Sequence, residues 1–92
     1  MKVCVDCHPF ETSEAKWYEE MRSNDKYHEY MGTVYESPKG VFYVYTVPKY
    51  YEGEGSWDIM PVDEILGELG KYLSISGKDY LASARWKGRR RI

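Results

Sequence analysis

Long apolar runs are missing from this sequence, and no stretch approaches the roughly 20 apolar residues that a membrane-spanning helix needs. The first ten residues, MKVCVDCHPF, turn polar too soon for the apolar stretch of a secretory signal peptide. Charged residues make up 30% of the chain, and the mean hydropathy is -0.68. We therefore expect a protein without a membrane partner that works in the cytoplasm, which is the host cytoplasm if the protein is viral.

Cysteine is scarce, with two residues among 92, and a cytoplasmic compartment would keep both thiols reduced. The segment Cys4-Val5-Asp6-Cys7-His8 matches the haem-attachment pattern of c-type cytochromes, but those proteins are assembled after export. Zinc needs four ligands, and no second Cys-x-x-Cys pair is present. The weak metal candidates are Cys4, Cys7, His8 and His28. We expect no cofactor, and a zinc-stabilised small domain remains an alternative.

Catalytic motifs are also lacking. The chain has neither a phosphate-binding P-loop nor a Gly-x-Gly-x-x-Gly turn, and its two histidines have no serine or cysteine partner at an informative spacing. Carboxylates are plentiful, but the group around Asp63, Glu64 and Glu68 is typical of a solvated helix face. The sequence therefore predicts a protein that is not an enzyme.

An overall excess of positive charge is absent too, since the net charge is -2. This excludes a globally basic nucleic-acid binder, although the charge is uneven along the chain. Residues 51–79 hold seven acidic and two basic side chains, whereas residues 80–92 hold five basic and no acidic ones. The basic end offers stacking and phosphate contacts through Arg85, Trp86, Lys87, Arg89, Arg90 and Arg91. An RNA- or single-strand-binding protein is therefore one alternative function.

What the sequence does contain is the pattern of one small domain, over residues 1–88, followed by a basic tail over 89–92. Alternation over Lys2 to Asp6 predicts a short strand that His8-Pro9 ends. Thr12 or Ser13 then starts a predicted helix that stops near Ser23 or, alternatively, reaches Met31 and closes at Gly32.

The centre of the chain has the clearest pattern. Two β-prone arms, at Tyr30–Glu36 and Val41–Val47, flank the turn sequence Ser37-Pro38-Lys39-Gly40, which suits a type I turn followed by a glycine bulge. The second arm is apolar or aromatic on both faces, so we expect an interior strand or one whose second face meets a partner. Pro48 ends it because proline has no N–H to donate.

After a glycine-rich acidic segment, Trp57 to Met60 predicts a brief strand, and helical spacing begins at Pro61. A second helix is predicted after a capping box at Ser76, with Gly88 just past its end. The expected order is β-α-β-β-(β)-α-α. The fold class is therefore α+β, a small antiparallel sheet with a central β-hairpin and helices packed on one face.

Tyrosine is the compositional outlier, with ten residues. Each buried phenol needs a hydrogen-bond partner, so we expect several to be exposed, although tyrosine also pairs well across strands without any partner protein. Tyr, Trp, Ser and Gly are the residues of adaptable recognition surfaces. The predicted protein-binding residues are Tyr43, Tyr45, Tyr50, Tyr51 and Trp57, with Glu52 and Glu54 as a charged rim.

These patterns favour a non-catalytic protein-binding module over the nucleic-acid and zinc alternatives. The general character, a compact tyrosine-rich domain without enzyme motifs, is similar to small phage accessory proteins that inhibit host or defence machinery. That similarity is one of type and implies an inhibitor that acts by occlusion.

Overall fold

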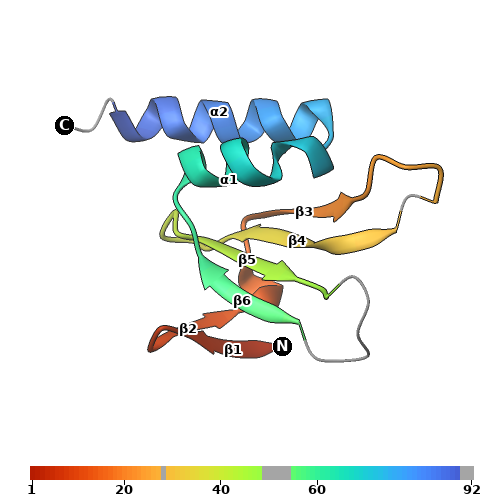
Figure 1. The fold of residues 1–92 in the computed structure, drawn as a ribbon. Helices are drawn as coiled ribbons and strands as arrows, with labels where there is room; N and C mark the ends of the chain where they lie inside the picture. The colour runs from red at the N-terminus through yellow and green to blue at the C-terminus, as the bar shows by residue number, and fades with distance from the viewer. Residues whose placement is uncertain (28, 49–54, 90–92) are drawn as a thin grey trace.

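The computed structural model describes residues 1–27, 29–48 and 55–89, and for 85–89 it describes the backbone alone. The elements in chain order are β1 (Lys2–Val5), β2 (His8–Glu11), the 3-10 helix η1 (Thr12–Glu14), β3 (Trp17–Arg22), β4 (Tyr30–Glu36), β5 (Phe42–Thr46), β6 (Ser56–Ile59), α1 (Val62–Leu69), the 3-10 helix η2 (Gly70–Tyr72) and α2 (Ile75–Arg89). Strands β3-β4-β5-β6 form an antiparallel sheet in that order, and β1 and β2 form a separate antiparallel pair. The helices lie on one face of the large sheet and the β1–β2 hairpin on the other (Figure 1). The α+β class is confirmed.

The central hairpin forms where the sequence predicts it. Strand β4 spans Tyr30–Glu36, and β5 lies within the predicted second arm. The Gly40 N–H donates to the Ser37 carbonyl at 2.9 Å, and Gly40 has φ +85°, a conformation that favours glycine. Strand β5 pairs with β4 on one side and with β6 on the other, so the prediction of an interior strand is confirmed.

The helix predicted from Thr12 or Ser13 does not form, whether it is taken to end near Ser23 or to reach Met31. Only η1 is helical there, and Trp17–Arg22 forms the edge strand β3. Trp17 and Met21 are four residues apart, a spacing that suits one helix face and also, with period two, one strand face. Pairing with β4 decides between them, because burial against the sheet outweighs a weak local helical preference.

The strand predicted over Lys2 to Asp6 forms as β1, but His8-Pro9 is not what ends it. Pro9 lies in β2 opposite Cys4, and Val5 pairs with His8, so Asp6 and Cys7 form a two-residue turn. Their φ values are +50° and +65°, as a type I′ turn requires at both central positions. The usual Asn-Gly signal of such turns is absent, which explains why a hairpin is not predicted here.

Helix α1 begins one residue after Pro61, close to the prediction, but the predicted limits of the second helix need correction. Helix α2 begins at Ile75, so Ser74 rather than Ser76 is its N-cap. The Gly77 N–H donates to Ser74 Oγ at 3.1 Å, as a capping serine requires. At the other end, Gly88 lies inside the helix instead of beyond it.

A carboxylate from the sheet completes this cap. Ser74 Oγ donates to Glu19 Oε1 at 2.6 Å, and the Ser74 N–H donates to Glu19 Oε2 at 3.3 Å. In a capping box the acid would sit three residues into the helix, but here β3 supplies it. Negative charge at this end of α2 is favourable because the helix dipole is positive there. The contact therefore fixes the start of α2 on the sheet.

Glu36 anchors α2 at a second point. Its side chain, 6% exposed, accepts a hydrogen bond from the Tyr80 hydroxyl and lies 3.3 Å from Lys16 Nζ. The Tyr80 ring stacks on Trp17 with 4.4 Å between ring centroids. Burial, with the hydrogen bond to Glu36 and its negative charge, raises the pKa of Tyr80 to about 12.

Two hydrophobic clusters flank the sheet. The larger one lies between sheet and helices and contains Met21, Val34, Phe42, Val44, Ile65, Leu73 and Leu81. The smaller one joins Val5 and Phe10 of the β1–β2 hairpin to Tyr43 of β5. Among the residues that the structure describes, no helix is long and apolar enough to cross a membrane.

Candidate functional site

The face of the large sheet opposite the helices carries most of its aromatic side chains. Strand register places Tyr18, Tyr35 and Tyr43 side by side in one row across β3, β4 and β5. In the next row, Tyr45 of β5 lies opposite Trp57 of β6. Because side chains two apart in a strand share a face, both rows project from the same side. We call this side the aromatic face.

Part of the aromatic face is covered by the β1–β2 hairpin. Phe10 stacks on Tyr43 with 4.3 Å between centroids and 3° between ring planes, and it meets Tyr35 edge-on at 5.8 Å. Tyr43 is consequently 5% exposed. The chain's own hairpin closes the second face of β5 at this position, which leaves Tyr43 little surface for the predicted contact with a partner.

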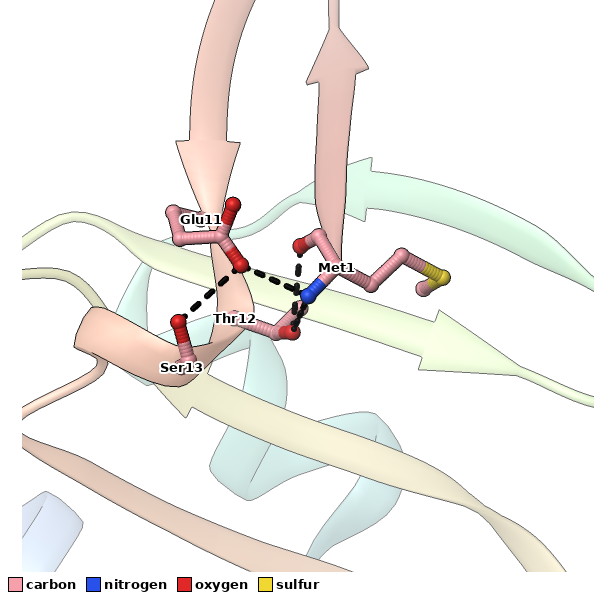
Figure 2. A network of polar contacts seen from close by, with 4 residues as sticks. All are labelled: Met1, Glu11, Thr12 and Ser13. Carbon is pink, nitrogen blue, oxygen red and sulfur yellow. Dashed lines mark hydrogen bonds and ion pairs between the residues drawn. The ribbon is translucent and has the colours of Figure 1, made fainter.

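The N-terminal amine helps to hold the hairpin in place. It donates to Glu11 Oε1 at 2.6 Å and to Thr12 Oγ1 at 3.1 Å, and Ser13 Oγ donates to the same Glu11 oxygen (Figure 2). The hydrogen bond from the amine is the main cause that lowers the pKa of Glu11. These contacts join the start of β1 to the end of β2 and the η1 turn.

The rest of the aromatic face is open, and we call it the open aromatic strip: Tyr18, Tyr30, Tyr35, Tyr45 and Trp57. Ring centroids are 6.0 Å apart from Tyr18 to Tyr35, 5.6 Å from Tyr35 to Trp57 and 5.0 Å from Trp57 to Tyr45. Tyr18 is 64% exposed and Tyr30 39%, while the other three are half-buried. Four of the rings, those of Tyr18, Tyr35, Trp57 and Tyr45, form a continuous row that draws on all four strands.

The rings of the strip are positioned by local contacts. Tyr45 Oη accepts a hydrogen bond from the Gly55 N–H at 3.2 Å, and its ring occupies the space that a Cβ on Gly55 would need. Tyr30 Oη and Thr33 Oγ1 are hydrogen-bonded at 2.6 Å. Burial is the main cause that raises the pKa of Tyr35. The hydroxyls of Tyr30 and Tyr45 are therefore held by hydrogen bonds, which leaves these two side chains less freedom to lose on binding.

The charge next to the strip is balanced. Glu20 and Arg22 follow Tyr18 on the same face of β3, and their side chains form an ion pair at 2.8 Å. Both are about half exposed, so the pair lies at the rim of the strip. The strip therefore has an uncharged centre and a rim that carries both signs, as protein interfaces commonly do.

Of the predicted binding residues, the structure brings Tyr45 and Trp57 together, while Tyr50, Tyr51, Glu52 and Glu54 lie outside the described residues. Sequence reasoning missed Tyr18, Tyr30 and Tyr35 as members of the site. The wrong helix over 12–23 hid Tyr18, and Tyr30 and Tyr35 were assigned to a strand without being placed on its face. A period-two reading of Trp17–Arg22, with tyrosine and charged residues on one side, was the available signal.

The predicted nucleic-acid contacts are placed only in part. Arg85, Trp86, Lys87 and Arg89 belong to α2, whose backbone is helical through Arg89. Arg90 and Arg91 lie outside the described residues. The structure thus extends the helix into the basic segment, and the predicted boundary between domain and tail at residue 89 falls at the last helical residue.

The three weak metal candidates that the structure describes, Cys4, Cys7 and His8, do not form part of a metal-binding cluster among the described residues. Cys4 on β1 and Cys7 in the turn are both exposed free thiols, and His8 begins β2. His28 lies outside the described residues. Within the part of the chain that the structure describes, no three Cys, His, Asp or Glu side chains converge in a way that could hold a metal ion.

Comparison of the chain with protein families, with curated proteins and with solved structures found no match.

Proposed function

We propose that this protein is a non-catalytic protein-binding module that contacts its partner through the open aromatic strip. The observation that carries the proposal is the part of the aromatic face that Phe10 does not close, where Tyr18 and Tyr30 are exposed. Three further rings of the strip, Tyr35, Tyr45 and Trp57, are half-buried beside them. Tyr and Trp are the residues in which binding energy concentrates at protein interfaces.

Charge supports a protein partner over nucleic acid at this surface. Nucleic-acid affinity depends on cations that neutralise phosphates. The cation at the rim, Arg22, is already paired with Glu20 at 2.8 Å, and the whole chain has a net charge of -2. The strip therefore offers ring faces without the positive field that a phosphate backbone requires.

The rigidity of the strip supports inhibition by occlusion. Its rings lie on strands of one paired sheet, so binding immobilises few additional side chains, and less conformational entropy is lost. A preformed flat surface of this kind can cover a functional surface of its partner without chemistry of its own. The module then acts simply by occupying the partner's site.

The test is affinity capture of the partner from the native host cell, followed by measurement of its affinity for two single variants, Tyr18→Ala and Trp57→Ala. Loss of one aromatic anchor is expected to weaken binding by about 2 kcal/mol, or roughly thirtyfold. Tyr18 is the more diagnostic position because its ring is 64% exposed.

Tyr27→Ala is the matched control, because Tyr27 is an equally exposed tyrosine, at 69%, that lies outside the strip. It should bind like the unmodified protein, and circular dichroism should show all three variants folded. A partner that binds Tyr18→Ala as tightly as Tyr27→Ala would exclude the strip as the interface.

A further inference from the structure

The β1–β2 hairpin forms a layer of its own, on the side of the large sheet away from the helices (Figure 1). Among the described residues, its two strands pair only with each other. Polar contacts of Met1, Glu11 and Thr12 join the ends of these strands and η1 to one another. The hairpin rests on the large sheet through the smaller hydrophobic cluster, to which it supplies the buried side chains of Val5 and Phe10.

This hairpin is held in place more weakly than the helices are. A two-stranded hairpin is at best marginally stable by itself, and each strand here has four residues. Its turn residues, Asp6 and Cys7, have φ values of +50° and +65°, which residues other than glycine rarely adopt. The cluster beneath the hairpin has three buried residues, against seven in the cluster beneath the helices. Opening the hairpin should therefore need less free energy than unfolding the rest of the domain.

Phe10 occupies a position on the aromatic face that a partner's side chain could take. Its ring lies parallel to that of Tyr43 with 4.3 Å between centroids, and it meets Tyr35 edge-on at 5.8 Å. Tyr43 is 5% exposed beneath it, and Tyr35 is half-buried between Phe10 and the open aromatic strip. Displacement of Phe10 would uncover Tyr43 and more of Tyr35, so the open strip would gain a further ring.

We propose that the β1–β2 hairpin is an autoinhibitory lid, which opens as a unit while the large sheet and the helices stay folded. In the closed position Phe10 competes with the partner for Tyr35 and Tyr43. This competition rests on the proposed function, whereas the opening itself does not. If the partner needs the uncovered rings, its apparent affinity is reduced by the fraction of molecules whose lid is closed.

Hydrogen exchange of the full chain, followed by NMR without any partner, tests the opening. After correction for intrinsic rates, the amides of Val5 and Phe10 should exchange at least about tenfold faster than those of Val34 and Val44. Ile65→Val trims the buried core on the helix side and should speed exchange at Val34 and Val44 by about fivefold. Exchange in the hairpin should not change, because the open-lid state keeps that core intact. Equal acceleration of both sets would show that the hairpin opens only in global unfolding, and would overturn the proposal.

The turn of the hairpin offers a variant that closes the lid. Asp6→Asn together with Cys7→Gly gives Asn-Gly, the sequence that a type I′ turn favours. Exchange of the hairpin amides should slow by about tenfold, and the affinity of the captured partner should fall by about tenfold. Lys39→Ala, in the exposed turn between β4 and β5, is the control and should change neither quantity.

An unchanged partner affinity in a variant with slower hairpin exchange would overturn the competition between Phe10 and the partner. The proposed function is tested separately, because Tyr18→Ala removes a ring of the strip that stays exposed while the lid is closed.

Discussion

The two faces of the large sheet are closed to very different extents. On the helix side, Met21, Val34 and Val44 are fully buried beneath α1 and α2. On the aromatic side, the β1–β2 hairpin covers Tyr43, while Tyr18 keeps 64% of its surface exposed. The same strands supply both faces by simple alternation, so the difference lies in what covers them.

This contrast separates stability from recognition. Two helices pack on one face of the sheet through the larger hydrophobic cluster, and carboxylates of the sheet also hold α2. On the other face, a hairpin of two four-residue strands covers only part of the surface. Apolar surface that a fold leaves uncovered at such a place commonly marks an interaction site. Substitutions on the helix side should therefore lower the stability of the fold. Substitutions on the aromatic side should mainly lower the affinity for a partner.

The largest effect is expected from Leu81→Ala, which removes a fully buried side chain of α2. We expect a loss of about 2–5 kcal/mol in the free energy of unfolding, measured by urea denaturation, because a cavity is left between helix and sheet. Tyr18→Ala, on the aromatic face, should change that free energy by less than about 1 kcal/mol. Comparable losses for the two variants would mean that the open strip is part of the structural core.

The sequence predicts the centre of this fold well and its start poorly, for identifiable physical reasons. The β4–β5 hairpin has a Pro-Lys-Gly turn between two β-prone arms, so local turn chemistry and strand pattern agree. Over Trp17–Arg22 the local signals do not agree, because the spacing of the apolar residues fits a helix as well as a strand. Pairing with β4, which follows later in the sequence, makes this segment a strand.

The candidate site, like the fold, could be predicted only where local sequence signals are sufficient. Tyr45 and Trp57 are predictable from the strand pattern and the concentration of Tyr and Trp over 43–57, whereas Tyr18 joins them only when β3 pairs with β4. The burial of Tyr43 depends on a type I′ turn through Asp6 and Cys7, two residues that rarely adopt positive φ. Contacts between distant segments therefore decide which tyrosines are exposed.

An intermediate effect on the free energy of unfolding is expected from alanine substitutions at two helical glycines. One glycine faces open space, and the other lies against a side chain of the sheet. A Cβ at Gly67 of α1 would meet open space, so Gly67→Ala should stabilise the protein by about 1 kcal/mol. A Cβ at Gly77 of α2 would collide with the Glu19 carboxylate. Gly77→Ala should lose that gain, because displacing Glu19 from Ser74 costs about as much as losing a helix cap.

A double-mutant cycle tests directly whether the contact with Glu19 is what removes the gain at Gly77. With Glu19→Ala already in place, Gly77→Ala no longer meets a carboxylate and should stabilise the protein by about 1 kcal/mol in thermal or urea unfolding. The Gly67→Ala increment should be the same with or without Glu19. If Gly77→Ala gave the same increment in both backgrounds, the contact between β3 and the start of α2 would not stabilise the closed face.

The effect confined to the narrowest conditions is a pH dependence on the helix side, which comes from Tyr80 and appears only in alkaline solution. Its pKa is raised to about 12 in the folded protein, whereas an unfolded tyrosine titrates near 10, so folding favours the protonated phenol. The stability that Tyr80 contributes should be complete below about pH 10 and should fall as the pH rises from there through about 12. In urea unfolding, the difference between the unmodified protein and Tyr80→Phe should be constant at lower pH and shrink above about pH 10. Tyr27→Phe, which changes an exposed phenol, should follow the unmodified protein throughout. A constant difference across the whole range would show that the Tyr80 hydroxyl does not depend on Glu36, and that packing alone holds α2 against this end of the sheet.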